Sequence, residues 1–283
     1  MPQAPPPPSP LSGSPARFRV VVDADACVPQ EARVALRIAV TPGEPELLLE
    51  RVPIPRLFLE RAPFEVAAIA RACGAVAEPG EGVLYVRTGD GYGSPPEAAD
   101  AARAAVEERG AAFRVVETGA ALMGAGWAAV VAAEAAAAGA TIGAAAALAL
   151  AAAGRTHVMA MLEHPEVVGL VAPSLYVTPA RMVTELDGEA VHTLAAVPKR
   201  ENALAALRDE FARRLRAEGG RPRIAVHHAA AGAAAEAMGA WCARHLDAAE
   251  IVIAPLTRHQ GARLGPGFLA IAWLSAVEAS EQG

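Results

Sequence analysis

A strand, a glycine-rich loop and a helix follow one another between residues 82 and 110, and this unit constrains the fold more than any other feature. The segment "GVLYVRTGDGYGSPPEAADAARAAVEERG" opens with an apolar run, passes through glycines and prolines, and continues as an alanine-rich helical segment. Another apolar run, "FRVVETG", follows directly. Parallel strands need a long crossover connection, and a helix between two strands supplies one. The segment therefore predicts an α/β fold with a parallel, Rossmann-like sheet covered by helices on both faces.

The pattern changes after residue 155. The runs "THVMAML", "MVTELDGEAVHTLAAV" and "RPRIAVHHA" are strand-like, and the second contains an Asp-Gly turn typical of a hairpin. Hairpins beside helices predict an α+β domain with a mixed or antiparallel sheet. We therefore expect a disordered proline-rich tail at 1–16, an N-terminal α/β domain at 17–155 and a C-terminal α+β domain at 156–279. A shorter strand is expected in "RVALRIAVTP".

Composition argues against several classes of protein. The net charge is −6 and arginine is scattered, which argues against a nucleic-acid or anionic-membrane partner. The three cysteines lie far apart and indicate a reduced, cytoplasmic protein. The long apolar stretch at 121–154 contains Glu134 and a break near Gly139, so two packed helices are expected there and no stable membrane insertion. A monomer is expected.

The loop "DADACVP" follows the first predicted strand, "FRVVV". Asp23 and Asp25 at the end of a strand are placed to hold Mg²⁺ or to form a phosphoaspartate, which is one hypothesis, a Mg-dependent phosphatase. Such chemistry also needs a lysine, and Lys199 is the only one in the sequence. The alternative is that both carboxylates cap turns and a helix. No histidine or cysteine spacing indicates a metal site, so no metal, cofactor or catalytic residue is predicted.

A lone arginine precedes a second glycine turn near the C-terminus. Arg263 lies two residues before Gly265, in "ARLGPGFLAIAWL", and the apolar run that starts at Phe268 predicts a buried helix. A guanidinium beside apolar residues needs a partner, and a carboxylate is the natural one. That carboxylate is either an internal Asp or Glu or part of a ligand. The glycine-rich loop at 89–95 is a second candidate anion site, although it matches neither a Walker loop nor a good dinucleotide fingerprint.

Several segments, in this order and spacing, resemble the DegV family of fatty-acid-binding proteins, which have the EDD fold. They are "VVVDADACVPQE", "GVLYVRTGDGYGSPPEAADAA", "FRVVETGAALMGAGWAAVVAAE", "MVTELDGEAVHTLAAV", "IAVHHA" and "LGPGFLAIAW". The resemblance runs from about Phe18 to Trp273. It implies a two-domain binding protein, not an enzyme, that holds a long-chain fatty acid in a buried apolar tunnel. It also implies a separate kinase subunit as partner, to which the fatty acid is presented.

The resemblance also implies a set of ligand-binding residues. The head group would be bound by Arg263, Tyr92, Ser94, Phe58, Asp25 and Gly265, and the acyl chain by Phe268, Leu269 and Met123. This chain departs from the family pattern in the head-group region. Phe58 stands where the family has a hydroxyl, Tyr92 where it has serine, and Arg263 where it has histidine. A ligand-free regulatory or structural relic of the scaffold therefore remains an alternative.

Overall fold

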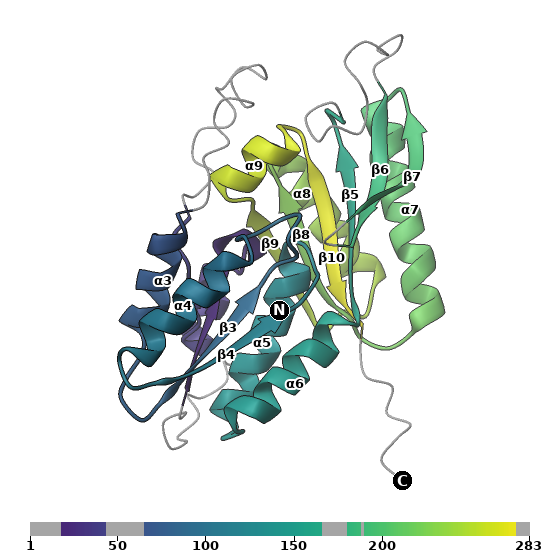
Figure 1. Cartoon of the computed structure of the whole chain (residues 1–283). Helices are drawn as coiled ribbons and strands as arrows, with labels where there is room; N and C mark the ends of the chain where they lie inside the picture. Colours follow the sequence, from purple (N-terminus) through teal and green to yellow (C-terminus); the bar gives the residue numbers. More distant parts are fainter. Residues whose placement is uncertain (1–17, 44–64, 166–179, 188–189, 276–283) are drawn as a thin grey trace.

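The computed structural model describes residues 18–43, 65–165, 180–187 and 190–275 (Figure 1). The predicted proline-rich tail and Phe58 lie outside the described residues. The described chain forms two sheets, one parallel with four strands and one mixed with six. This arrangement confirms the predicted α/β fold class with an α+β second half.

The first sheet has the strand order β2-β1-β3-β4, and all its pairings are parallel. Its strands are β1 (Phe18–Val22), β2 (Ala39–Val40), β3 (Gly82–Arg87) and β4 (Ala112–Glu117). Helices α3 (Val66–Ala75) and α4 (Glu97–Glu107) cover one face, where they pack on Val21, Val83 and Tyr85. The alternate residues Val20, Leu84 and Val86 face the other way, as the two-residue period of a strand requires.

The second sheet has the order β7-β6-β5-β10-β8-β9, and its pairings are antiparallel except for that of β8 with β9. Its strands are β5 (Thr156–Leu162), β6 (Arg181–Leu186), β7 (Val191–Val197), β8 (Arg223–His228), β9 (Glu250–Pro255) and β10 (Leu269–Leu274). Helices α7 (Arg200–Glu218) and α8 (Gly232–His245) cover one face, with Phe211 packed edge-on against Trp273.

Helices α5 (Met123–Ala137) and α6 (Ile142–Ala153) link the two sheets, and α5 lies between them (Figure 1). One continuous apolar cluster joins α5 to β1 on one side and to β5 and β10 on the other. Alanine and glycine make this close approach possible: a Cβ on Gly126 would lie 3.1 Å from the Ala26 carbonyl oxygen. The expected break near Gly139 is confirmed, because α5 ends at Ala137 and α6 begins at Ile142.

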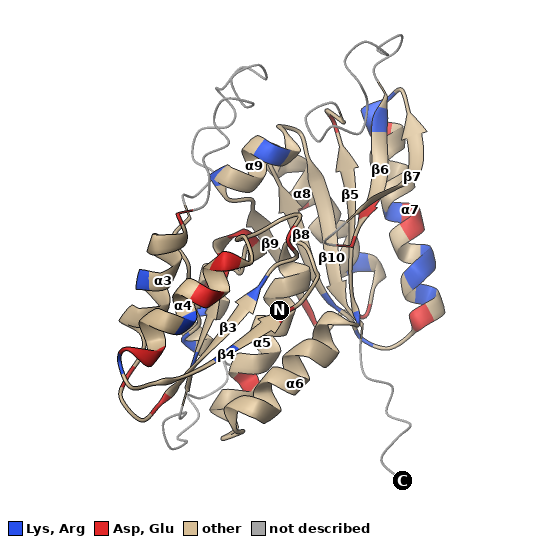
Figure 2. Ribbon diagram, in the orientation of Figure 1, with Lys and Arg blue, Asp and Glu red and all other residues tan. Residues whose placement is uncertain are grey.

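Charged residues also support the contact between the two halves. Glu134 is the one charged residue within the apolar stretch at 121–154. It forms a bidentate ion pair with Arg223 of β8, with Arg223 Nη2 2.7 Å from Glu134 Oε1. Helix α7 carries both signs of charge along its exposed side (Figure 2). None of the described helices is long and apolar enough to cross a membrane.

One expectation was wrong, and a second was met only in part. The run that begins at Phe268 forms strand β10 and not the predicted helix. Its side chains alternate between the two faces of the sheet: Leu269, Ile271 and Trp273 face α7 and α8, and Ala270 and Ala272 face α5. A central strand buried on both faces has no alternation of apolar and polar residues, so its sequence resembles that of a buried helix. The segment 33–36 belongs to helix α1 (Gln30–Leu36), and the short strand predicted there is confined to Ala39–Val40.

Candidate ligand head-group site

The carboxyl ends of β1 and β3 meet at one edge of the parallel sheet. The loop after β1 contains the short 3₁₀ helix η1 (Ala24–Ala26), and the loop after β3 is the glycine-rich segment 88–96. Helix α9 (Arg258–Leu264), from the other half of the chain, contacts both loops. Ligands of open α/β sheets bind outside the carboxyl ends of the strands, so this edge is the candidate position of a binding site.

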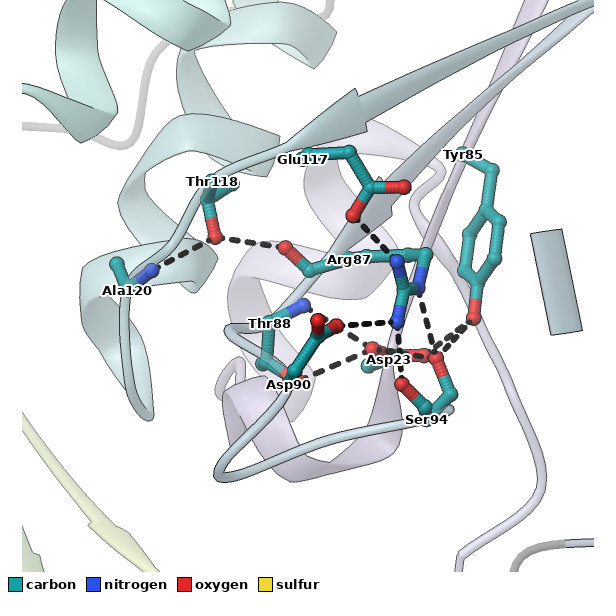
Figure 3. A network of polar contacts seen from close by, with 9 residues as sticks. All are labelled: Asp23, Tyr85, Arg87, Thr88, Asp90, Ser94, Glu117, Thr118 and Ala120. Atoms are coloured by element: carbon teal, nitrogen blue, oxygen red, sulfur yellow. Dashed lines mark hydrogen bonds and ion pairs between the residues drawn. The ribbon is translucent and has the colours of Figure 1, made fainter. Parts of the chain in front are cut away.

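At this end of the sheet, the Asp23 carboxylate accepts hydrogen bonds on both of its oxygens (Figure 3). Its Oδ1 accepts from the Tyr85 hydroxyl at 2.5 Å, and its Oδ2 accepts from the Thr88 N–H and the Ser94 hydroxyl, each at 3.0 Å. The Thr88 hydroxyl donates to Oδ2 as well, at 3.1 Å. Burial raises the pKa of Asp23, and the four hydrogen bonds act against that rise. Asp23 therefore holds the glycine-rich loop against β1.

The side chain of Arg87 also binds the glycine-rich loop (Figure 3). It forms an ion pair with Glu117, donates to Asp90 at 3.0 Å, and donates to the Ser94 carbonyl oxygen at 2.5 Å. The two ends of the loop lie so close together that a Cβ on Gly93 would lie 1.4 Å from Thr88 Oγ1. The glycine-rich loop thus closes over an internal carboxylate, and the hydroxyl of Ser94 serves that network.

Asp25 lies two residues further on and contacts the other half of the chain. Its Oδ1 accepts from the Thr257 hydroxyl at 2.5 Å, and its Oδ2 lies 2.7 Å from His259 Nδ1. Thr257 is also the N-cap of α9, since its oxygen accepts from the Gln260 N–H at 3.1 Å. The buried Asp25 carboxylate therefore fixes where α9 begins relative to the parallel sheet.

Tyr92 is the second point at which α9 contacts the parallel half. The guanidinium of Arg263 lies over the Tyr92 ring, 5.2 Å from its centroid, which is a cation–π contact. The amide nitrogen of Gln260 donates to the Tyr92 carbonyl oxygen. Burial raises the pKa of Tyr92 to about 12, so its phenol stays neutral at neutral pH. We call Tyr92, His259, Gln260 and Arg263 the α9 cluster.

The structure brings some of the predicted residues together and separates others. Arg263 and Tyr92 are in contact, and Asp25 contacts the same helix, α9, at His259. Gly265 ends α9 with a φ of 85°, a left-handed value that favours glycine.

The remaining predicted residues lie elsewhere. Ser94 is turned to Asp23. Met123 and Phe268 lie in the core on the α5 side of the six-stranded sheet, whereas Leu269 faces α7 and α8.

Sequence reasoning missed three residues at this edge: Thr257, His259 and Gln260. The segment "TRHQ" has the capping-box spacing of a threonine followed three residues later by glutamine, which marks a helix start. That signal would have located the beginning of α9. It would not have shown that α9 contacts Asp25 and Tyr92.

The geometry offers little to the phosphatase hypothesis. Both oxygens of Asp23 accept hydrogen bonds within the protein, and both oxygens of Asp25 are engaged by α9. Magnesium needs carboxylate oxygens that are open to it. Within the part of the chain that the structure describes, no group of three or more His, Cys, Asp or Glu side chains is arranged to hold a metal ion.

The fold is a two-sheet α/β scaffold, and the basic side chains His259 and Arg263 lie where its two halves meet. Comparison with known proteins identifies the family. Residues 60–276 match the family model described as an uncharacterised protein of the DegV family. The chain belongs to the DegV family. The comparison with curated protein sequences gives no match.

Solved structures of DegV proteins have the same fold. One from Corynebacterium glutamicum is 22% identical, with a TM-score of 0.70 over 93% of this chain and 98% of that one. A DegV protein from Thermus thermophilus, described by its fatty acid binding, is 20% identical, with a TM-score of 0.72 over 92% and 100%. A stearic-acid-binding protein from Eubacterium ventriosum is 9% identical, with a TM-score of 0.74 over 91% and 98%.

Proposed function

We propose that this protein binds a long-chain fatty acid, or a similar apolar carboxylate, with the carboxylate head group at the α9 cluster. The observation that carries the proposal is the position of the Arg263 guanidinium, which lies over the buried ring of Tyr92 where α9 contacts the loops after β1 and β3. A guanidinium held there binds a carboxylate by charge-assisted hydrogen bonds. The fatty-acid-binding descriptions of the Thermus and Eubacterium proteins support the same ligand class.

The acyl chain of such a ligand needs an apolar tunnel. Burial of each CH₂ contributes about 0.8 kcal/mol, so a chain of palmitate length supplies most of the binding free energy while the head group sets specificity. The predicted tunnel residues lie on both sides of the six-stranded sheet: Phe268 and Met123 on the α5 side, and Leu269 on the α7 and α8 side.

Two tryptophans distinguish these sides, because Trp127 lies in the α5 cluster and Trp273 in the α7 and α8 cluster. A brominated fatty acid quenches the fluorescence of a nearby indole. Quenching that is lost in Trp127→Phe places the chain between the sheets, and quenching that is lost in Trp273→Phe places it under α7 and α8.

We propose in addition that the protein has a partner, a separate kinase subunit. By its resemblance to the family, the protein presents the bound acid to a separate kinase subunit, which phosphorylates the carboxylate. The test is formation of an acyl phosphate from ATP and the loaded protein in the presence of a fatty-acid kinase subunit. Acyl phosphate formed at the same rate from free palmitate would contradict this role.

The proposed ligand is tested by organic extraction of the purified protein and mass spectrometry of the extract. We expect a stoichiometric fatty acid, recovered again after the emptied protein is incubated with palmitate or stearate. Arg263→Ala should lose most of it, whereas the matched control Arg109→Ala, at an exposed position after α4, should retain it. A clean extract from the wild-type protein, before and after incubation, would support the ligand-free relic.

A further inference from the structure

Helix α9 contains a buried amide with an unused acceptor. The side chain of Gln260 is fully buried, and its Nε2 donates to the Tyr92 carbonyl oxygen. Its Oε1 accepts no hydrogen bond from any of the described residues. A carbonyl oxygen such as that of Tyr92 can only accept, so the amide nitrogen must face it and the orientation of the Gln260 amide is fixed. The side chain therefore keeps one acceptor in need of a donor.

The unused acceptor belongs to the proposed head-group site. Gln260 and Arg263 are three residues apart on α9 and so lie on the same side of the helix. Both contact Tyr92, Gln260 at the main chain and Arg263 at the ring. A buried polar atom without a partner is unfavourable, and the rare cases call for a water or a ligand group. The site thus combines a cation for a carboxylate with an acceptor for a neighbouring donor.

We propose that the preferred ligand carries a hydroxyl beside its carboxylate, as a 2-hydroxy or 3-hydroxy fatty acid does. Arg263 binds the carboxylate, and Gln260 Oε1 accepts from the ligand hydroxyl. This inference rests on the proposed function. A protonated carboxyl group would also offer a donor, but the guanidinium of Arg263 favours the ionised form. The ligand class is therefore an acid whose donor lies on one of the first carbons of the chain.

The experiment compares palmitate, 2-hydroxypalmitate and 3-hydroxypalmitate by calorimetric titration of the delipidated protein. We expect at least one hydroxy acid to bind about tenfold more tightly than palmitate, the effect of one good hydrogen bond. In Gln260→Met, which removes the acceptor and keeps similar bulk, the two affinities should become equal. Circular dichroism shows whether the variant is folded.

The outcomes separate this inference from the proposed function. Equal affinity of wild-type protein for all three acids overturns the inference and leaves fatty acid binding in place, with a water molecule as the partner of Oε1. A hydroxy-acid preference that persists in Gln260→Met overturns the role of Gln260. Failure of all three acids to bind overturns the proposed function itself. If Gln260→Met does not fold, the wild-type comparison still decides whether a preference exists.

Discussion

Asp23 and Asp25 lie two residues apart, yet their carboxylates have different roles in this protein. Asp23 is bound by groups of the parallel half alone, from β3 and the loop that follows it. Asp25 is bound by Thr257 and His259, which come from the other half of the chain. Asp23 thus stabilises one sheet edge, whereas Asp25 fixes the position of a helix on it.

The comparison separates residues that maintain the fold from residues that form the proposed binding site. A carboxylate whose acceptor capacity is filled within one half has nothing left for a ligand. The contacts between the halves, by contrast, place the basic side chains His259 and Arg263 above the carboxyl ends of β1 and β3. We therefore expect substitutions in the Asp23 network to change stability, and substitutions around Asp25 to change binding.

The largest effect is expected for Asp23→Ala. It leaves the Thr88 N–H and the Tyr85 and Ser94 hydroxyls without their acceptor in a buried place, at a cost of about 3 kcal/mol or more in the free energy of unfolding. Asp23→Asn retains an acceptor oxygen and should lose less than half as much. Urea unfolding measures both, and equal losses would show that the hydrogen bonds to Asp23 contribute little.

The buried side chain of His227 in β8 should make the free energy of unfolding depend on pH. Burial lowers the pKa of His227 to about 4 from 6.5, although its Nδ1 bonds to the Ala254 carbonyl oxygen at 3.2 Å. The unfolded chain then binds a proton that the folded protein excludes, so stability is full above pH 6.5 and falls as the pH drops toward 4. The loss should reach about 3 kcal/mol.

Urea unfolding across this pH range tests the prediction. His227→Asn should flatten the dependence, whereas a change at the exposed His245 should leave it as it is. A wild-type protein of constant stability between pH 7 and pH 4 would contradict the burial of a neutral imidazole.

Gly93→Ala should destabilise the protein by about 1 to 3 kcal/mol, because the added Cβ overlaps Thr88 Oγ1 and lies 2.9 Å from Asp23 Oδ2. Gly110→Ala is not an equivalent control, since Gly110 has a positive φ. Gly154→Ala is suitable, because a Cβ there meets nothing nearer than 3.8 Å. Thermal unfolding of the two variants makes the comparison, and equal melting temperatures would argue against a tightly closed loop.

The smallest effect on stability is expected for Asp25→Asn. The amide oxygen still accepts from Thr257, so the loss should stay below about 1 kcal/mol. The charge that pairs with His259 is gone, however, and α9 is held less firmly. Palmitate affinity should therefore fall about tenfold in a calorimetric titration. A loss of stability as large as that of Asp23→Ala, with unchanged affinity, would reverse the roles assigned to the two carboxylates.

Local patterns predicted most of the fold. The β3–loop–α4–β4 unit and the helix pair at 123–153 follow from glycine positions and apolar runs within single segments. Strand β10 could not be recognised, because both its faces are buried and its sequence lacks the alternation that marks a strand.

The site was harder to predict than the fold. Arg263 and Tyr92 were expected to lie near each other, and they are in contact. The partners of Asp25 were not foreseen, because Thr257 and His259 are 232 and 234 residues away and meet it only through the packing of the two halves. No local pattern carries that information. Nor could the sequence show that the hydroxyl of Ser94 is turned to Asp23.

The central claim is that Arg263 meets the carboxylate of an apolar acid. Palmitate labelled with carbon-13 at its carboxyl carbon tests it by nuclear magnetic resonance of the complex. We expect one bound resonance whose titration midpoint lies below that of the free acid, since the guanidinium favours the ionised form. In Arg263→Ala the midpoint should rise, while Arg109→Ala should match the wild type. An identical resonance and midpoint in Arg263→Ala would contradict the account.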